Sequence, residues 1–204
     1  MGVDVDRELT VVVGFKPNDK QIQVAYLARV SGFNDLQDIA KRFNVKAAVI
    51  DIEPETRKVR DFQAAERYPV YLCDYLEKAT GEGVKWDAER KLVRVNRTEV
   101  CDGTHDLVTH GKLILPRRCD EIEVFAKQLT NTAKAIEEDS ETGSREYRYR
   151  KLGPDHYYHA LNYLSLAARK VGVSESALEI YQPRVQAEMD FDPHTYDQDS
   201  PTDL

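Results

Sequence analysis

Cysteine is scarce in this chain of 204 residues, which has only three residues of that type. Cys73, Cys101 and Cys119 are odd in number and widely spaced, and no two of them form a Cys-x-x-Cys pair. This pattern argues against a disulfide framework and against a cysteine-based zinc or redox site. We interpret the three as reduced bystanders, because a chain of this length can enclose a single core without cross-links.

Long apolar runs are also missing. No stretch approaches the roughly 20 residues that span a bilayer, and the N-terminus lacks the basic and then apolar layout of a signal peptide. We therefore expect a cytoplasmic protein that has no membrane partner.

Positive charge is in the minority, with 29 lysines and arginines against 36 acids and a formal net charge of -7. Domains that coat nucleic acid by charge alone are usually strongly basic, so the composition argues against that class. No lysine or arginine follows Met189, so the body of the chain is closer to neutral than the total suggests. Four basic clusters, residues 57–60, 89–97, 116–118 and 145–151, could be solvated faces or could bind an anionic partner.

The order of the expected elements predicts an α/β fold. Three extended segments come first, and after a helix at residues 34–44, with Asn34 as its N-cap, an apolar strand follows at residues 47–52. The later expected elements are a helix after Pro54, a strand at 68–73, a hairpin at 84–95, a helix at 97–110, an extended piece at 112–116, a helix at 120–138, a strand at 146–152 and a last helix from 155. We expect a mixed sheet, an antiparallel three-strand meander followed by parallel strands, flanked by helices.

The chain is expected to form one domain over residues 1–175. Residues 176–204 read as a C-terminal extension that is acidic and disordered from about residue 189. Because the first strand begins without a preceding turn or cap, we expect the chain to be a piece of a longer protein.

Three carboxylates have a distinctive placement among apolar residues. Asp4 lies in the first strand, Asp51 directly follows the apolar run "AAVI", and Asp155 opens the last helix. Carboxylates that are brought close together repel one another, so a fold that gathers them needs a compensating cation. Oxygen ligands of this kind suit Mg²⁺ or Mn²⁺, and two such ions can activate water for phosphodiester cleavage.

Each acid also has a structural alternative. Asp4 could be an exposed strand residue, and Asp155 could only cap its helix. Asp51 is harder to explain in that way, because it ends a buried strand with a charge.

The last helix has two predicted sides. Tyr157, Leu161 and Leu164 repeat at helical spacing and make a core-facing stripe, whereas Asp155 and the polar residues in register with it are expected to point away from the core. The polar residues in register are His159 and Asn162. We interpret His156 and His159 as orienting or packing residues, since the expected ions prefer oxygen.

Five segments resemble, in the same order, the nuclease domains of phage terminase large subunits: "GVDVD", "AAVIDIEPETRKVRDF", "VNRTEVCDG", "GKLILP" and "GPDHYYHALNYL". The resemblance runs from about Gly2 to Val171, and it implies a ribonuclease H-like fold. It also implies a metal-dependent DNA endonuclease, largely indifferent to sequence, that cuts concatemeric DNA when packaging starts and ends. Matched by position, Asp4, Asp51 and Asp155 are the catalytic residues and the ligands of one or two Mg²⁺ or Mn²⁺ ions.

The family further implies double-stranded DNA, the capsid portal protein and the small terminase subunit as partners, in the host cytoplasm. Its ATPase part is not expected here, because the chain has no Gly-x-x-x-x-Gly-Lys-Ser/Thr phosphate loop. Family members often have a glycine or small residue at the position of Asp6, which could be an accessory ligand or a neutral change. The residues expected to hold the DNA backbone are Arg57, Lys58, Arg145 and Arg148.

Two other functions stay open at this point. A junction resolvase or a ribonuclease H would keep the fold and the acids but change the substrate. A non-catalytic module that binds the portal or the small subunit would leave the acids unused.

Overall fold

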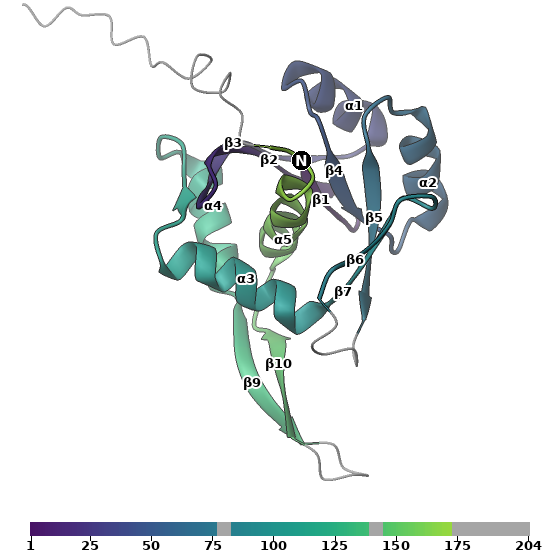
Figure 1. Cartoon of the computed structure of the whole chain (residues 1–204). Coiled ribbons are helices and arrows are strands. Elements are labelled where there is room, and N and C mark those ends of the chain that lie inside the picture. Colours follow the sequence, from purple (N-terminus) through teal and green to yellow (C-terminus); the bar gives the residue numbers. More distant parts are fainter. Residues whose placement is uncertain (77–82, 139–144, 173–204) are drawn as a thin grey trace, which may run out of the picture.

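A computed structural model describes residues 1–76, 83–138 and 145–172. In this part of the chain the main sheet has eight strands in the order β6-β7-β5-β4-β1-β2-β3-β8 (Figure 1). Their bounds are β1 Gly2–Val5, β2 Leu9–Asn18, β3 Gln21–Val30, β4 Ala48–Asp51, β5 Val70–Leu76, β6 Lys85–Asp87, β7 Leu92–Asn96 and β8 Leu113–Ile114.

The pairing of these strands confirms the predicted mixed sheet. β1, β2 and β3 form an antiparallel meander, and β4 then pairs with β1 in parallel. β5 is parallel to β4, β7 is parallel to β5, and β6 turns back antiparallel to β7. The predicted hairpin at residues 84–95 is therefore also confirmed.

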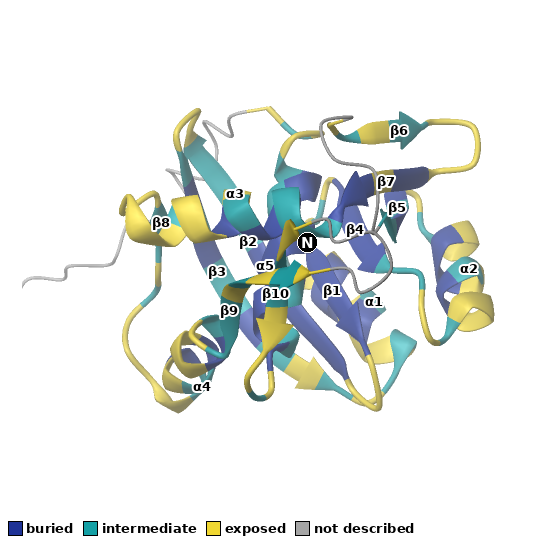
Figure 2. Ribbon diagram, turned by 90° about the horizontal axis from the view of Figure 1, so that it is seen from below, coloured by how far each residue is buried: buried dark blue, intermediate teal, exposed yellow. Residues whose placement is uncertain are grey.

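Helices flank both faces of the sheet. α1 (Phe33–Arg42) and α2 (Thr56–Ala65) pack on the face that carries Val3 and Val5 of β1, in one apolar cluster. α3 (Arg97–Thr109), α4 (Asp120–Leu129) and α5 (His156–Ala168) lie on the other face. Figure 2 shows that the central strands are buried between these layers, whereas the outward sides of α2 and α4 are exposed.

α5 lies directly on β1. A Cβ atom at Gly2 would overlap with the carbonyl oxygen of Ala160 and the amide nitrogen of Leu164, both in the backbone of α5. Glycine is the residue that allows such a close approach of two backbones. The contact fixes the height of α5 above the sheet, and with it the position of the first turn of α5.

Two predictions for the helices are wrong. Asn34 is not the N-cap of α1, which begins at Phe33 after Gly32 and has no side-chain cap bond. The helix predicted at residues 120–138 ends at Leu129, and Thr132–Glu138 is instead strand β9, paired antiparallel with β10 (Arg145–Lys151) in a separate hairpin that projects from the body (Figure 1). The long-range ladder to β10 overrides the local helix preference of β9.

The polar side of α5 is also different from its prediction. Asn162 is fully buried, and the His159 side chain is only 11% exposed, because α3 packs against this side of α5. The side chain of Asn162 donates to the hydroxyl of Tyr75 at 3.4 Å and contacts Sγ of Cys101 at 3.5 Å. The polar side of α5 therefore faces a buried region between α5 and α3 that contains both polar and apolar side chains, and not the solvent.

The three cysteines are free thiols, as predicted. Cys73 and Cys101 are buried, and Cys119 is exposed at the start of α4. Burial raises the pKa of Cys73 well above its ordinary value and that of Cys101 to about 11.

The expectations for a membrane span and for the C-terminal extension can be compared only with the described residues. None of their helices combines the length and the apolar character that a bilayer crossing requires. The extension expected at residues 176–204 lies outside the described residues.

Candidate active site

Asp4 and Asp51 lie on neighbouring strands at the same level of the sheet. The parallel register pairs Val3 with Ile50, so the next residue of each strand is an aspartate. Paired residues of parallel strands point to the same face, and the alternation from Val3 places both carboxylates on the face of α5. Asp4 is only 6% exposed, so the alternative of an exposed strand residue is wrong.

Burial raises the pKa of Asp51 to about 6. The backbone N–H of Glu53 donates to Oδ1 of Asp51 at 3.2 Å and lowers the pKa, but the negative charge of Asp4 raises it again. No ion pair to Asp51 is found among the described residues. A cation placed between Asp4 and Asp51 would therefore stabilise the ionised form of both.

Asp155 is at the N-cap position of α5, but its side chain makes no cap hydrogen bond. Its Oδ1 lies 2.7 Å from Nζ of Lys151, and its Oδ2 lies 3.4 Å from Nε2 of His159. Burial, which alone would raise the pKa of Asp155, is outweighed by the contacts with His159 and Lys151, which lower it to about 2. The alternative that this carboxylate serves only as a helix cap is wrong.

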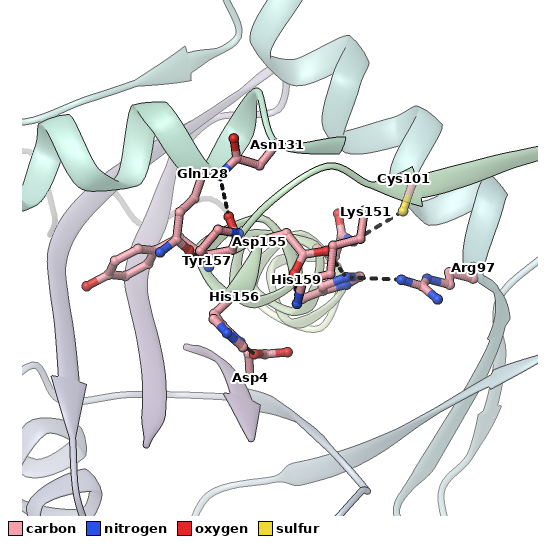
Figure 3. A network of polar contacts seen from close by, with 12 residues as sticks. Asp4, Arg97, Cys101, Gln128, Asn131, Lys151, Asp155, His156, Tyr157 and His159 are labelled. Carbon is pink, nitrogen blue, oxygen red and sulfur yellow. Dashed lines mark hydrogen bonds and ion pairs between the residues drawn. The ribbon is translucent and has the colours of Figure 1, made fainter. Parts of the chain in front are cut away.

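His156 connects the first turn of α5 to β1. Its Nδ1 lies 2.9 Å from Oδ2 of Asp4, and its Nε2 lies 3.7 Å from Oδ2 of Asp6. The hydrogen bond with Asp4 raises the pKa of His156. Figure 3 shows His156 reaching Asp4 on one side of the helix start and His159 beside Asp155 on the other. Both histidines thus contact and orient carboxylates, as interpreted from the sequence.

Two cations of this network end basic clusters of the sequence, but neither was predicted to contact the acids. Lys151 ends β10, and Arg97 begins α3, where its Nη2 lies 3.3 Å from Nε2 of His159 (Figure 3). The sequence does indicate that α3 begins at Arg97, because Asn96 is a typical N-cap residue. Its Oδ1 accepts from the backbone N–H of Glu99 at 3.1 Å. No local pattern indicates that Lys151 and Arg97 meet the same histidine–aspartate pair.

The basic residues expected to hold DNA are mostly elsewhere. Arg57 and Lys58 are exposed on α2, which covers the sheet face opposite to α5. Arg145 and Arg148 belong to β10, where each contacts an acid: Nε of Arg145 lies 3.0 Å from Glu138, and Nη2 of Arg148 lies 3.4 Å from Glu146. Of these four, only the two hairpin arginines share an element with a residue of the site, Lys151.

The three acids are brought to one face but do not form a closed ligand cluster. Within the described ranges, no three or more His, Cys, Asp or Glu side chains are grouped so that they could hold a metal ion. The donor chemistry nevertheless suits Mg²⁺ or Mn²⁺, since Asp4 and Asp51 offer neighbouring oxygen ligands and the described part of the chain shows no ion pair to Asp51. Asp155 could join them by exchanging Lys151 for a metal ion.

Comparisons of the chain with protein-family models, with curated proteins and with solved structures gave no significant match.

Proposed function

We propose that this chain is a divalent-metal-dependent endonuclease domain that acts on double-stranded DNA and has a ribonuclease H-like fold. The observation that carries the proposal is the placement of Asp4 and Asp51 side by side on parallel strands, with Asp155 at the start of the helix above them. Three acids from segments far apart in the sequence thus lie on the same side of the sheet, and metal-assisted phosphodiester hydrolysis uses oxygen ligands of this kind.

Asp4, Asp51 and Asp155 would hold one or two Mg²⁺ or Mn²⁺ ions. Such ions supply electrostatic stabilisation of the reacting phosphate and lower the pKa of a bound water. His156 keeps the carboxylate of Asp4 in place through its 2.9 Å contact, and the buried setting of Asp4 and Asp155 limits the access of bulk water. The contacts of Asp155 with His159 and Lys151 favour its ionised form.

The biological setting is proposed from the sequence resemblance. It assigns the cut to concatemeric viral DNA at the start and end of packaging, with the capsid portal protein and the small terminase subunit as partners. The hairpin β9–β10 would approach DNA, because its last residue, Lys151, contacts Asp155; its strands carry four further cations, each of which is paired with an acid. These cations are Lys134, Arg145, Arg148 and Arg150.

A plasmid nicking assay with Mn²⁺ tests the enzyme. Wild type is expected to relax supercoiled DNA, whereas Asp51→Asn and Asp155→Asn should each lose activity by at least about 100-fold. Asp38→Asn is the matched control, since Asp38 is an exposed acid of α1 on the opposite face and should keep full activity. Full activity of both site variants would remove the proposed site.

The same assay separates the alternatives. A four-way junction or an RNA–DNA hybrid that is cut far faster than duplex DNA would favour a resolvase or a ribonuclease H. Calorimetry that detects no Mn²⁺ binding would favour a non-catalytic portal-binding module.

A further inference from the structure

Arg97 differs from the other arginines of the described residues in its surroundings. Many of those lie beside an acid, such as Arg94, whose Nε is 3.4 Å from Oδ2 of Asp74, and most of the rest are exposed. Arg60 is partly buried without an acid, but its Nη1 donates to Gln63 and to the carbonyl of Arg90. Arg97 is also partly buried, yet in the described part of the chain neither a carboxylate nor a carbonyl accepts from its guanidinium.

Among the described residues, the one hydrogen-bonding contact of the Arg97 side chain is with an imidazole. Its Nη2 lies 3.3 Å from Nε2 of His159, while its Nε is shielded from solvent and has no hydrogen-bond partner. A buried donor without an acceptor is costly, and such atoms in folded proteins call for an explanation. The guanidinium therefore has a buried unused donor, Nε, and its Nη1, which is not among the buried unpartnered atoms, has no partner in the described residues.

His159 cannot satisfy both of its neighbours. The same Nε2 atom lies 3.4 Å from Oδ2 of Asp155, and one ring nitrogen cannot accept from Arg97 and donate to Asp155 at the same time. The other ring nitrogen, Nδ1, is buried without a partner. The contacts therefore run from Arg97 through His159 to Asp155. When Nε2 of His159 donates to Asp155, the guanidinium of Arg97 is left without an acceptor.

We infer that Arg97 binds a non-bridging oxygen of the DNA phosphodiester that lies beside Asp155. This inference rests on the proposed nuclease function and assigns a substrate-binding residue to it. The planar guanidinium fork matches the oxygens of a phosphate, which would accept from the Nη1 and Nη2 groups at its outer edge. A phosphate that enters a site lined by three aspartates also needs a protein cation to offset their repulsion, and Arg97 is not already matched by an acid.

Steady-state cleavage of a short DNA duplex with Mn²⁺ tests the role of Arg97. Arg97→Gln is expected to lower kcat/KM by at least about 30-fold through a raised KM, and Arg97→Lys should recover part of this loss, because it keeps the charge but not the fork. Mn²⁺ affinity, measured by calorimetry, should stay within about twofold, since Arg97 offers no ligand oxygen or imidazole. Arg94→Gln, which removes a nearby arginine already paired with Asp74, should leave kcat/KM unchanged.

A purely structural arginine would give a different result. If Arg97 only props His159, Arg97→Gln should weaken Mn²⁺ binding and lower thermal stability without a selective change in KM, and this outcome would overturn the inference. If the wild type cuts DNA and Arg97→Gln has the same kcat/KM, the inference about Arg97 is overturned, but the proposed nuclease function is not. Failure of the wild type to cut any DNA would instead remove the proposed function and this inference with it.

A second measurement covers the case in which Arg97→Gln does not fold. The wild-type protein, labelled with ¹⁵N, is titrated with the dinucleotide d(TpT) in the presence of Ca²⁺, and the arginine Nε–H signals are followed by NMR. The Arg97 signal, identified by its absence in Arg97→Lys, should shift and become protected from exchange. A signal that does not respond at saturating dinucleotide would overturn the inference.

Discussion

The two ends of the contact between α5 and the sheet differ in kind. At Gly2 the backbones of β1 and α5 touch so closely that no side chain fits between them. Two residues further along β1, at Asp4, the same interface is filled by a carboxylate and an imidazole. One end is thus held by close packing and the other by charge, within a single strand of four residues.

The difference shows how a polar site can be kept in place. Charged groups that are buried tend to relax apart or to admit water unless the surrounding elements are fixed. Close packing at Gly2 fixes α5, so the first turn of the helix must remain near Asp4 and Asp51. The apolar end therefore positions the residues of the polar end.

The largest expected effect comes from breaking the packed end. Gly2→Ala should lower the free energy of unfolding by more than about 4 kcal/mol or prevent folding, because the added methyl group meets backbone atoms of α5 that cannot move aside. Urea unfolding followed by circular dichroism measures the change. Gly103→Ala is the control, since nothing lies within 4 Å of its new Cβ in α3, and it should gain up to about 1 kcal/mol. Equal urea midpoints for the two variants would contradict the close contact.

The next effect concerns the unpaired acid of the polar end. The pKa of Asp51 is raised in the folded state, from 3.8 to about 6, so the stability that this group contributes is present below pH 4 and is lost as the pH rises through 6. Asp51→Asn should therefore be more stable than wild type at pH 7, by up to about 3 kcal/mol, and the two should converge at low pH. Thermal unfolding from pH 4 to pH 8 checks this. A variant that is less stable than wild type at pH 7 would show that Asp51 is well compensated.

A smaller effect with the opposite pH dependence is expected at Asp155. Its pKa is lowered to about 2, so its contribution to stability is present above pH 4 and is lost as the pH falls through 2. Lys151→Met should raise that pKa and cost about 1 kcal/mol at pH 7, a modest value because the Lys151 side chain is 54% exposed. Acid unfolding should then begin at a higher pH.

Lys134→Met is the control for the hairpin. Lys134 also forms an ion pair, with Nζ 2.8 Å from Oδ1 of Asp102, but Asp102 is far more exposed than Asp155. Its removal should leave the onset of acid unfolding unchanged. Identical acid profiles for the two lysine variants would mean that the burial of Asp155 has no energetic consequence.

The smallest effect is expected beyond the packed end of α5. Nζ of Lys170 lies 4.1 Å from the ring centroid of Trp86 and 5.3 Å from that of Tyr71. Lys170→Gln should cost less than about 1 kcal/mol, since the contact is partly exposed. The fluorescence of Trp86, the only tryptophan, should shift in the variant, whereas Lys20→Gln should leave it unchanged. An unaltered spectrum in Lys170→Gln would exclude this contact in solution.

Much of the sheet could be predicted because its signals are local. The alternation in "GVDVD" separates Val3 from Asp4, and the apolar run before Asp51 identifies a central strand, so the strands that carry two acids of the site could be predicted. Strand β10 matches the strand predicted at 146–152, but β9 was not predicted, since the residues after Leu129 favour a helix and only pairing with β10 makes them a strand. The local sequence of β9 carries no information about its pairing with β10.

The polar partners of the site were harder to predict than the acids. Asp155 was identified from its place before an amphipathic helix, but its carboxylate contacts Lys151, which the hairpin brings back to the helix start. Arg97 arrives from α3 and meets His159 only because α3 packs on the side of α5 that was expected to face solvent. These contacts depend on how whole elements pack, which helical periodicity does not report.

The arrangement of the thiols has a practical consequence for studying the protein. The thiolate is the form that attacks an alkylating reagent, so Cys73 and Cys101, which are buried and have raised pKa values, should react slowly, while the exposed Cys119 should react first. A fluorophore could then be attached at one position of the unmodified sequence, at the start of α4. Such a label would report the binding of DNA or of a partner protein without any engineered cysteine.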